Sequence, residues 1–160
     1  VLRRAELPVT MVGVGGREVT GSHNIRIVCD ISDTEASPDN LQMVVLPGGL
    51  PGTLNLEKSS VVQRFLDRAV EENCWIAAIC AAPSILGHRG LLAGREATCF
   101  PGFEEQLTGA RLSKEYVCVD GTYVTGKGMG VATEFALKLV ELLKGREPAE
   151  KLRDSLQCRK

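Results

Sequence analysis

The sequence predicts an α/β fold of flavodoxin-like kind, a three-layer sandwich in which helices cover both faces of a mostly parallel sheet. Two short uncharged runs, residues 43–46 and 75–79, have the length and apolarity of strands that are covered on both faces. Residues 59–73 lie between them and repeat apolar side chains at helical spacing. A helix between two such strands is the crossover that a parallel pair requires. Ligands are therefore expected at the carboxyl ends of these strands.

Composition favours a single domain with a substantial core. The chain has 160 residues, a net charge of −1 and no internal repeat or linker. No basic run indicates nucleic acid or an anionic membrane, and no apolar stretch has the length of a membrane span. We therefore expect a cytoplasmic protein whose partner is a small molecule or another protein.

Six cysteines are scattered through core-like stretches without a Cys-x-x-Cys pair. They are Cys29, Cys74, Cys80, Cys99, Cys118 and Cys158. Only His23 and His88 could join them as nitrogen ligands, and each is expected to be a solvated turn residue. The sequence therefore supports neither a zinc site nor a disulfide framework, and we expect reduced thiols and no metal or cofactor.

Before the first buried strand, the sequence predicts the end of a helix, three extended pieces and a turn-rich loop. In chain order these are residues 1–6, 8–14, 18–20, 25–29 and 30–40. Pro47-Gly48-Gly49 follows the buried strand at 43–46. Glycines at this point let the backbone approach a ligand closely.

After the second buried strand, the prediction alternates short strands with loops and ends in two helices. In chain order it has a helix beginning at Pro83, a loop at 87–94, a strand at 97–99, a turn at 101–105, strands at 116–119 and 123–125, a glycine-rich loop at 126–130, and helices at 132–143 and 147–158. Asp120-Gly121 is a strong signal for a two-residue hairpin turn. The last helix has few apolar residues and is expected on the surface.

The prediction centres on residues 75–86, where a strand ends on Cys80 and a helix follows at once. Ala81 and Ala82 are small enough for a sharp turn, and Pro83 suits the first turn of a helix. This order is that of the nucleophile elbow of hydrolases, with cysteine as the nucleophile. A helix dipole and free backbone N–H groups would favour the thiolate, the reactive form. The alternative is a packing role, because free cysteine is often buried.

Three motifs carry a resemblance to a known family over essentially the whole chain. They are Val45-Leu46-Pro47-Gly48-Gly49, Ala77-Ala78-Ile79-Cys80-Ala81-Ala82-Pro83, and Gly128-x-Gly130 followed by Glu134-Phe135-Ala136. They are similar to motifs of the ThiJ/PfpI superfamily, in the branch of the Parkinsonism-associated protein deglycase and its bacterial relatives. The resemblance implies a homodimeric flavodoxin-like fold and a cofactor-independent glyoxalase or deglycase acting on methylglyoxal, glyoxal or their adducts. It is equally compatible with a redox-sensing or chaperone role that needs no turnover.

The resemblance also implies the residues of a site. Cys80 would be the reactive, oxidisable thiolate, and the backbone N–H groups of Gly49 and Ala81 would bind an oxyanion. Other residues expected to line the site are Gly48, Pro83, Phe100, Pro101, Gly128 and Met129. Lys127 and Met129 stand where relatives usually have arginine and proline, so the substrate contacts of this loop are left open.

One group of the family pattern has no counterpart in the sequence. Relatives place a glutamate, hydrogen-bonded to the cysteine, between a first strand and a first helix. We therefore interpret residues 1–160 as a single domain that lacks this strand and part of this helix. The carrier of the proton is the part of the chemistry that the sequence leaves unassigned.

Overall fold

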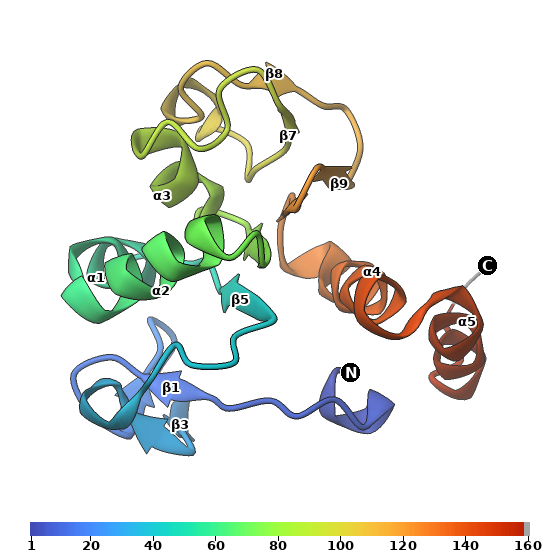
Figure 1. Cartoon of the computed structure of the whole chain (residues 1–160), viewed down its shortest axis with the longest axis horizontal. Coiled ribbons are helices and arrows are strands. Elements are labelled where there is room, and N and C mark those ends of the chain that lie inside the picture. The colour runs from blue at the N-terminus through green and yellow to red at the C-terminus, as the bar shows by residue number, and fades with distance from the viewer. Residues whose placement is uncertain (159–160) are drawn as a thin grey trace.

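A four-stranded sheet in the order β5–β6–β10–β9 forms the centre of the molecule, in a computed structural model that describes residues 1–158 (Figure 1). Its strands are β5 (Met43–Leu46), β6 (Trp75–Ile79), β10 (Tyr123–Gly126) and β9 (Val117–Asp120). β5, β6 and β10 are parallel, and β9 runs antiparallel to β10. This arrangement confirms the predicted α/β fold with a mostly parallel sheet.

The side chains of β6 divide the core into two layers. Ile76 and Ala78 pack in one cluster with Leu66 of α2 (Ser60–Glu71). Ala77, which points to the opposite face, packs in a second cluster with Phe135 and other residues of α4 (Ala132–Lys144). One helix therefore covers each face of the strand that leads to Cys80.

The crossover between β5 and β6 contains two helices where the sequence predicted one. α2 begins after Ser59, whose side chain accepts a hydrogen bond from the Val62 N–H, as expected of a helix cap. The additional helix is α1 (Gly52–Lys58). Its start at Pro51 and Gly52 has little helix propensity, which is why the sequence prediction missed it. The Thr53 hydroxyl of α1 donates to the Gly49 carbonyl at 3.0 Å and so fastens the loop after β5.

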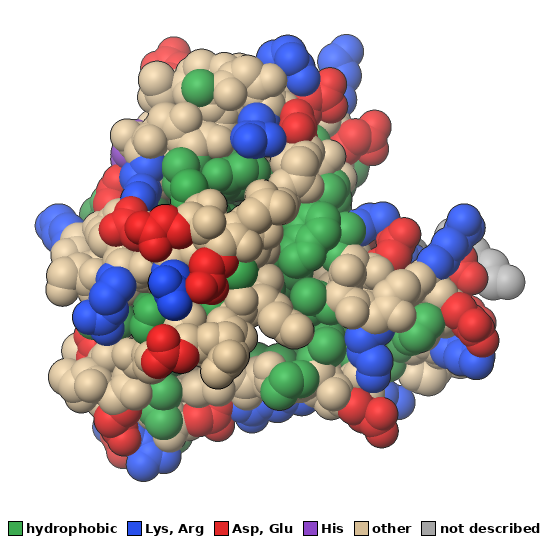
Figure 2. Space-filling view, viewed as in Figure 1, with side chains coloured by type: hydrophobic (Ala, Val, Ile, Leu, Met, Phe, Trp, Pro, Cys, Tyr) green, Lys and Arg blue, Asp and Glu red, His purple; other side chains and the backbone are tan. Residues whose placement is uncertain are grey.

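The N-terminal part forms two small sheets of its own. β1 (Val12–Gly13) pairs in parallel with β4 (Ile31–Ser32), and β2 (Glu18–Thr20) forms a hairpin with β3 (Arg26–Val28). The predicted strand at 8–14 is therefore shortened to two residues, because within residues 1–158 it has a partner on one edge only. Figure 2 shows the surface hollowed between β5 and the N-terminal segment.

The N-terminal segment itself is a single 3-10 turn, η1 (Arg3–Ala5), where the sequence predicted the end of a helix. The side chain of Arg3 forms an ion pair with Asp30, which follows the β2–β3 hairpin. η2 (Asp33–Glu35) then begins the polar segment that leads to β5.

The segment between the elbow and the second half of the sheet contains only short elements. They are α3 (Pro83–His88), β7 (Glu96–Ala97), η3 (Glu104–Gln106) and β8 (Arg111–Leu112). The strand predicted at 97–99 is therefore shorter and begins one residue earlier, as β7. Its partner β8 was not predicted, because a strand of two residues has no periodic pattern in the sequence. The β9–β10 hairpin is present, but its turn is Gly121-Thr122, one residue later than predicted, because Asp120 pairs with Tyr123.

The chain ends in a pair of packed helices. η4 (Met129–Val131) leads into α4, and α5 (Arg146–Ser155) follows after Gly145. α5 ends before residue 158, earlier than predicted, and its Ala149 and Leu152 are buried against α4. The helix therefore exposes one face and packs with the other. Among the helices described, none is long and apolar enough to cross a membrane.

Candidate active site

Cys80 lies in the turn between β6 and α3 with a left-handed backbone, at φ 66°. This conformation is uncommon for a residue other than glycine and requires support from its surroundings. The Cys80 N–H donates to the Gly126 carbonyl at 2.8 Å, and the Cys80 carbonyl accepts from the Phe100 N–H at 2.8 Å. Both backbone groups of Cys80 are thus held by segments far away in the sequence.

The loop after β5 lies directly against this turn. A Cβ on Gly48 would lie 2.5 Å from the Cys80 Cβ and 2.4 Å from the Ile79 carbonyl oxygen, so only glycine fits there. The same position would be 2.9 Å from the Ala81 nitrogen. Gly49 follows at φ 92° and turns the chain toward α1. The structure therefore brings Gly48, Gly49 and Ala81 beside Cys80.

Two backbone donors in this region are not engaged by the protein. Within residues 1–158, neither the Gly49 N–H nor the Ala81 N–H donates a hydrogen bond. The next residue along, Ala82, donates to the Ile79 carbonyl at 3.2 Å, and Pro83 has no N–H. Free N–H groups beside a nucleophile can bind an oxygen that becomes negatively charged during a reaction.

Most of the remaining predicted lining residues lie in two loops that adjoin the elbow and contact each other. The Phe100 ring packs over Gly128, with its Cδ2 atom 3.3 Å from the position of a Cβ on that glycine. Pro101 and Met129 follow these two residues and are exposed. Pro83 differs from them, because it is buried in the first turn of α3.

Thr125, a buried residue that helps to position the elbow, was not identified from the sequence. Its hydroxyl accepts a hydrogen bond from the Thr98 N–H at 2.9 Å. This bond joins β10 to the segment that ends in Phe100, and both of these elements hold the backbone of Cys80. The sequence indicated only that Thr125 belongs to the predicted strand at 123–125.

Cys99 is buried next to the elbow, as expected of a packing residue. Burial, with smaller contributions from the neighbouring Glu104 and Cys80 side chains, raises the pKa of the Cys99 thiol to about 11. Burial also raises the pKa of Cys118 and of Cys74, and the Cys74 thiol donates to the Leu41 carbonyl. These thiols are held in the unreactive protonated form.

The two histidines do not contribute to this site. His88 ends α3, at the opposite end of the helix from Cys80, and its Nδ1 lies 2.5 Å from the Glu57 Oε1. His88 is exposed, as predicted, but it is the last residue of α3 and not a loop residue, and its partner comes from α1. His23 lies on an exposed turn, with its Nδ1 3.1 Å from the Ser22 hydroxyl. In the part of the chain that the structure describes, no group of His, Cys, Asp and Glu is arranged to bind a metal.

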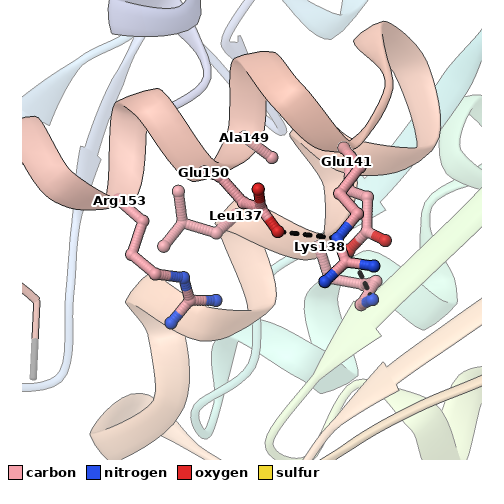
Figure 3. A pocket seen from close by; sticks show the side chains of 7 residues that line it. Leu137, Lys138, Glu141, Ala149, Glu150 and Arg153 are labelled. Carbon is pink, nitrogen blue, oxygen red and sulfur yellow. Dashed lines mark hydrogen bonds and ion pairs between the residues drawn. The ribbon is translucent and has the colours of Figure 1, made fainter. Parts of the chain in front are cut away.

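A cleft of about 330 Å³ lies elsewhere, between α4 and α5 (Figure 3). Its charged side chains are largely paired with each other. Lys138 contacts Glu141 at 2.5 Å, and Arg146 contacts Glu150 at 2.6 Å. No residue from the carboxyl ends of β5, β6 or β10 lines this cleft, so it is separate from the cysteine elbow.

Replacement of Gly48 by alanine should displace the elbow and lower the reactivity of Cys80 at least tenfold, because the added Cβ overlaps the Cys80 side chain. In the unaltered protein, substoichiometric iodoacetamide and peptide mapping should label Cys80 before the other five cysteines. Gly52→Ala is the matched control, since a Cβ there meets no atom within 4 Å. Labelling of Cys158 or Cys29 first, or equal rates in the two variants, would contradict this assignment.

Stability should fall as the pH rises from about 9 to about 11, because unfolded Cys99 loses its proton near pH 9.0 whereas folded Cys99 keeps it up to about pH 11. The unfolded state binds fewer protons in this window, so the free energy of unfolding decreases, by about 2 kcal/mol from this group. Urea unfolding at pH 8 and pH 10.5 measures the loss. The loss should be smaller in Cys99→Ala, and an identical loss in both proteins would show that Cys99 has no such pKa.

The family of the chain follows from its similarity to known proteins. The profile of the DJ-1/PfpI family matches residues 1–142. Protein dj-1beta of Drosophila melanogaster is 38% identical over 159 residues, which are 98% of this chain and 85% of that protein. Its crystal structure covers 99% of this chain and 87% of that one, with a TM-score of 0.92 at 36% identity.

Two further relatives have names that state an activity. The glutathione-independent glyoxalase DJR-1.2 of Caenorhabditis elegans is 33% identical over 154 residues, 95% of this chain and 82% of that protein. A protein of Pyrococcus abyssi named as a deglycase is 31% identical over 129 residues, 79% of this chain and 76% of that protein. With the cysteine elbow at the end of β6 and the match over residues 1–142, the chain belongs to the DJ-1/PfpI family.

Proposed function

We propose that this protein is a cysteine-dependent glyoxalase or deglycase that acts on methylglyoxal, glyoxal or their adducts on other molecules. The observation that carries the proposal is the left-handed Cys80 beside the unengaged N–H groups of Gly49 and Ala81. The activities named for the relatives from Caenorhabditis elegans and Pyrococcus abyssi support the same class of reaction.

The reaction would begin with addition of the Cys80 thiolate to the aldehyde carbon of the substrate. A C–S bond forms, and the electron pair of the carbonyl moves onto its oxygen. The N–H groups of Gly49 and Ala81 would stabilise this oxyanion as it develops. A proton then moves from the sulfur-bearing carbon to the neighbouring carbonyl carbon, as the first oxygen becomes a carbonyl and the second a hydroxyl, which leaves a thioester on Cys80. Water breaks the C–S bond of this thioester and releases the acid and the thiol. Methylglyoxal and one water thus give lactate, with no external oxidant or reductant.

The proton transfer needs a base within hydrogen-bond reach of the hemithioacetal. No carboxylate from residues 1–158 is hydrogen-bonded to the Cys80 thiol. We propose that an additional strand ending in a glutamate supplies this base from a position between β1 and β5. In the described part of the chain each of these strands is paired on one edge only, and their residues Val12 and Val45 are exposed. A strand inserted there would join the two sheets and end near the elbow, because carboxyl ends of parallel strands meet at one edge.

A redox role is the second candidate, and the same geometry supports it. Oxidation of Cys80 by a peroxide needs no acid–base partner, and no such partner lies within residues 1–158. The N–H groups of Gly49 and Ala81 would then bind the oxygens of a sulfinate. This role predicts a Cys80 that oxidises readily in a protein that does not consume aldehydes.

Methylglyoxal consumption separates these roles. An extended chain with an upstream strand ending in glutamate should consume methylglyoxal about 10²–10⁴-fold faster than the 160-residue chain, since that is the usual contribution of a general acid–base group. The matched control ends the same strand in glutamine and should stay slow, and Cys80→Ser should abolish turnover in every version. Equal rates for the glutamate and glutamine versions, at equal folded concentration, would mean that another group carries the proton.

We also propose that the protein is a homodimer and that the β2–β3 hairpin contributes to the contact. Ile25 and Ile27, two positions apart and hence on one face of the hairpin, are 66% and 48% exposed. Light scattering at micromolar concentration should give twice 17.2 kDa. Ile27→Asp should shift the mass toward the monomer, whereas Leu112→Asp, on the exposed strand β8, should not. A monomer in the unaltered protein would refute the proposal.

A further inference from the structure

We infer that an apolar rim beside Cys80, formed by the side chains of Leu50, Phe100 and Met129, selects aldehydes whose non-reacting substituent is bulky and apolar. This inference rests on the proposed function and narrows its substrate class. It predicts that a phenyl-substituted aldehyde is preferred to one that carries a hydrogen or a carboxylate.

The three rim residues come from three different loops that adjoin the elbow. Leu50 is two residues after Gly48, which touches the Cys80 side chain. Phe100 donates its N–H to the Cys80 carbonyl at 2.8 Å. Met129 follows Gly128, whose missing side chain leaves room for the Phe100 ring. The three loops that carry these residues therefore meet at the turn that contains Cys80.

These side chains are more exposed than their apolar character would favour. The exposed fractions are 49% for Leu50, 47% for Phe100 and 90% for Met129, whereas the adjacent Cys99 is 4% exposed. A single exposed apolar residue is ordinary, but a group of them around a reactive centre is typical of a binding site. The rim thus offers apolar surface that a substrate can remove from water.

The charged side chains near the rim are engaged by other groups. The Lys127 ammonium donates to the Lys114 carbonyl at 3.3 Å and lies 4.8 Å from the centre of the Tyr116 ring. The Glu104 carboxylate accepts the Gly102 N–H at 2.6 Å. Each of these two charged groups therefore already has a partner within the protein. An apolar substituent is therefore the one that this rim favours.

The expected preference follows from the area of a phenyl ring that the rim could cover. Covering roughly 55 Å² of one face, at the usual free energy per area of apolar surface, corresponds to about a tenfold gain in rate or affinity. Removal of one of the rim side chains should lower this preference about threefold.

The test uses alkylation of Cys80, because this reaction requires the thiol and the rim but no turnover. Second-order rate constants for iodoacetanilide and iodoacetamide are measured by peptide mapping, and their ratio is divided by the same ratio for glutathione. The unaltered protein should give a value of about ten. Phe100→Ser and Met129→Ser should each lower the value about threefold. Val70→Ser, an exposed valine near the end of α2 and at the opposite end of β6, should leave it unchanged.

Two results would overturn the inference: a ratio equal to that of glutathione in the unaltered protein, or an unchanged ratio in both serine variants. The Met129 side chain is almost fully exposed, so its replacement keeps the test valid if Phe100→Ser unfolds. A preserved phenyl preference without methylglyoxal consumption by any version would refute the proposed function and leave the rim in place. Methylglyoxal consumption without a phenyl preference would refute the rim alone.

Discussion

The left-handed backbone of Cys80 is the constraint on which the site depends. A residue other than glycine in this conformation costs about 1–3 kcal/mol and persists only where its surroundings impose it. Here the ends of several segments do so: Gly126 and Phe100 hold the two backbone groups of Cys80, and Gly48 leaves the space that its side chain needs. The register of the central sheet therefore determines the geometry of the thiol.

The core of the molecule is built to keep that register. β6 is hydrogen-bonded on both sides, and its small residues Ala77 and Ala78 allow helices on both faces to approach closely. The central sheet does not include the N-terminal strands, because β1 belongs to a separate sheet. Three parallel strands of the central sheet are thus sufficient to position the elbow. Under the proposed function, the group that moves the proton would come from a strand that joins the two sheets.

The sequence predicted those features that leave a local pattern. Apolar periodicity and capping residues act over a few positions. The sequence therefore predicted the buried strands, the cap of α2 and the order strand–cysteine–helix. The left-handed Cys80, the contact of Gly48 with its side chain and the pair of His88 with Glu57 were not predicted, since each depends on residues distant in the sequence. The predicted lengths of β1 and β7 were wrong for the same reason, because a strand extends only as far as its partner does.

The buried thiol of Cys99 has a consequence for the lifetime of an oxidised site. With its pKa raised to about 11, only about one Cys99 in 10⁴ is a thiolate at pH 7. Thiol–disulfide chemistry proceeds through the thiolate, so Cys99 cannot rapidly capture a sulfenic acid on its neighbour. We therefore do not expect Cys99 to act as a resolving thiol at neutral pH, so that reduction of an oxidised Cys80 would depend on a thiol from elsewhere.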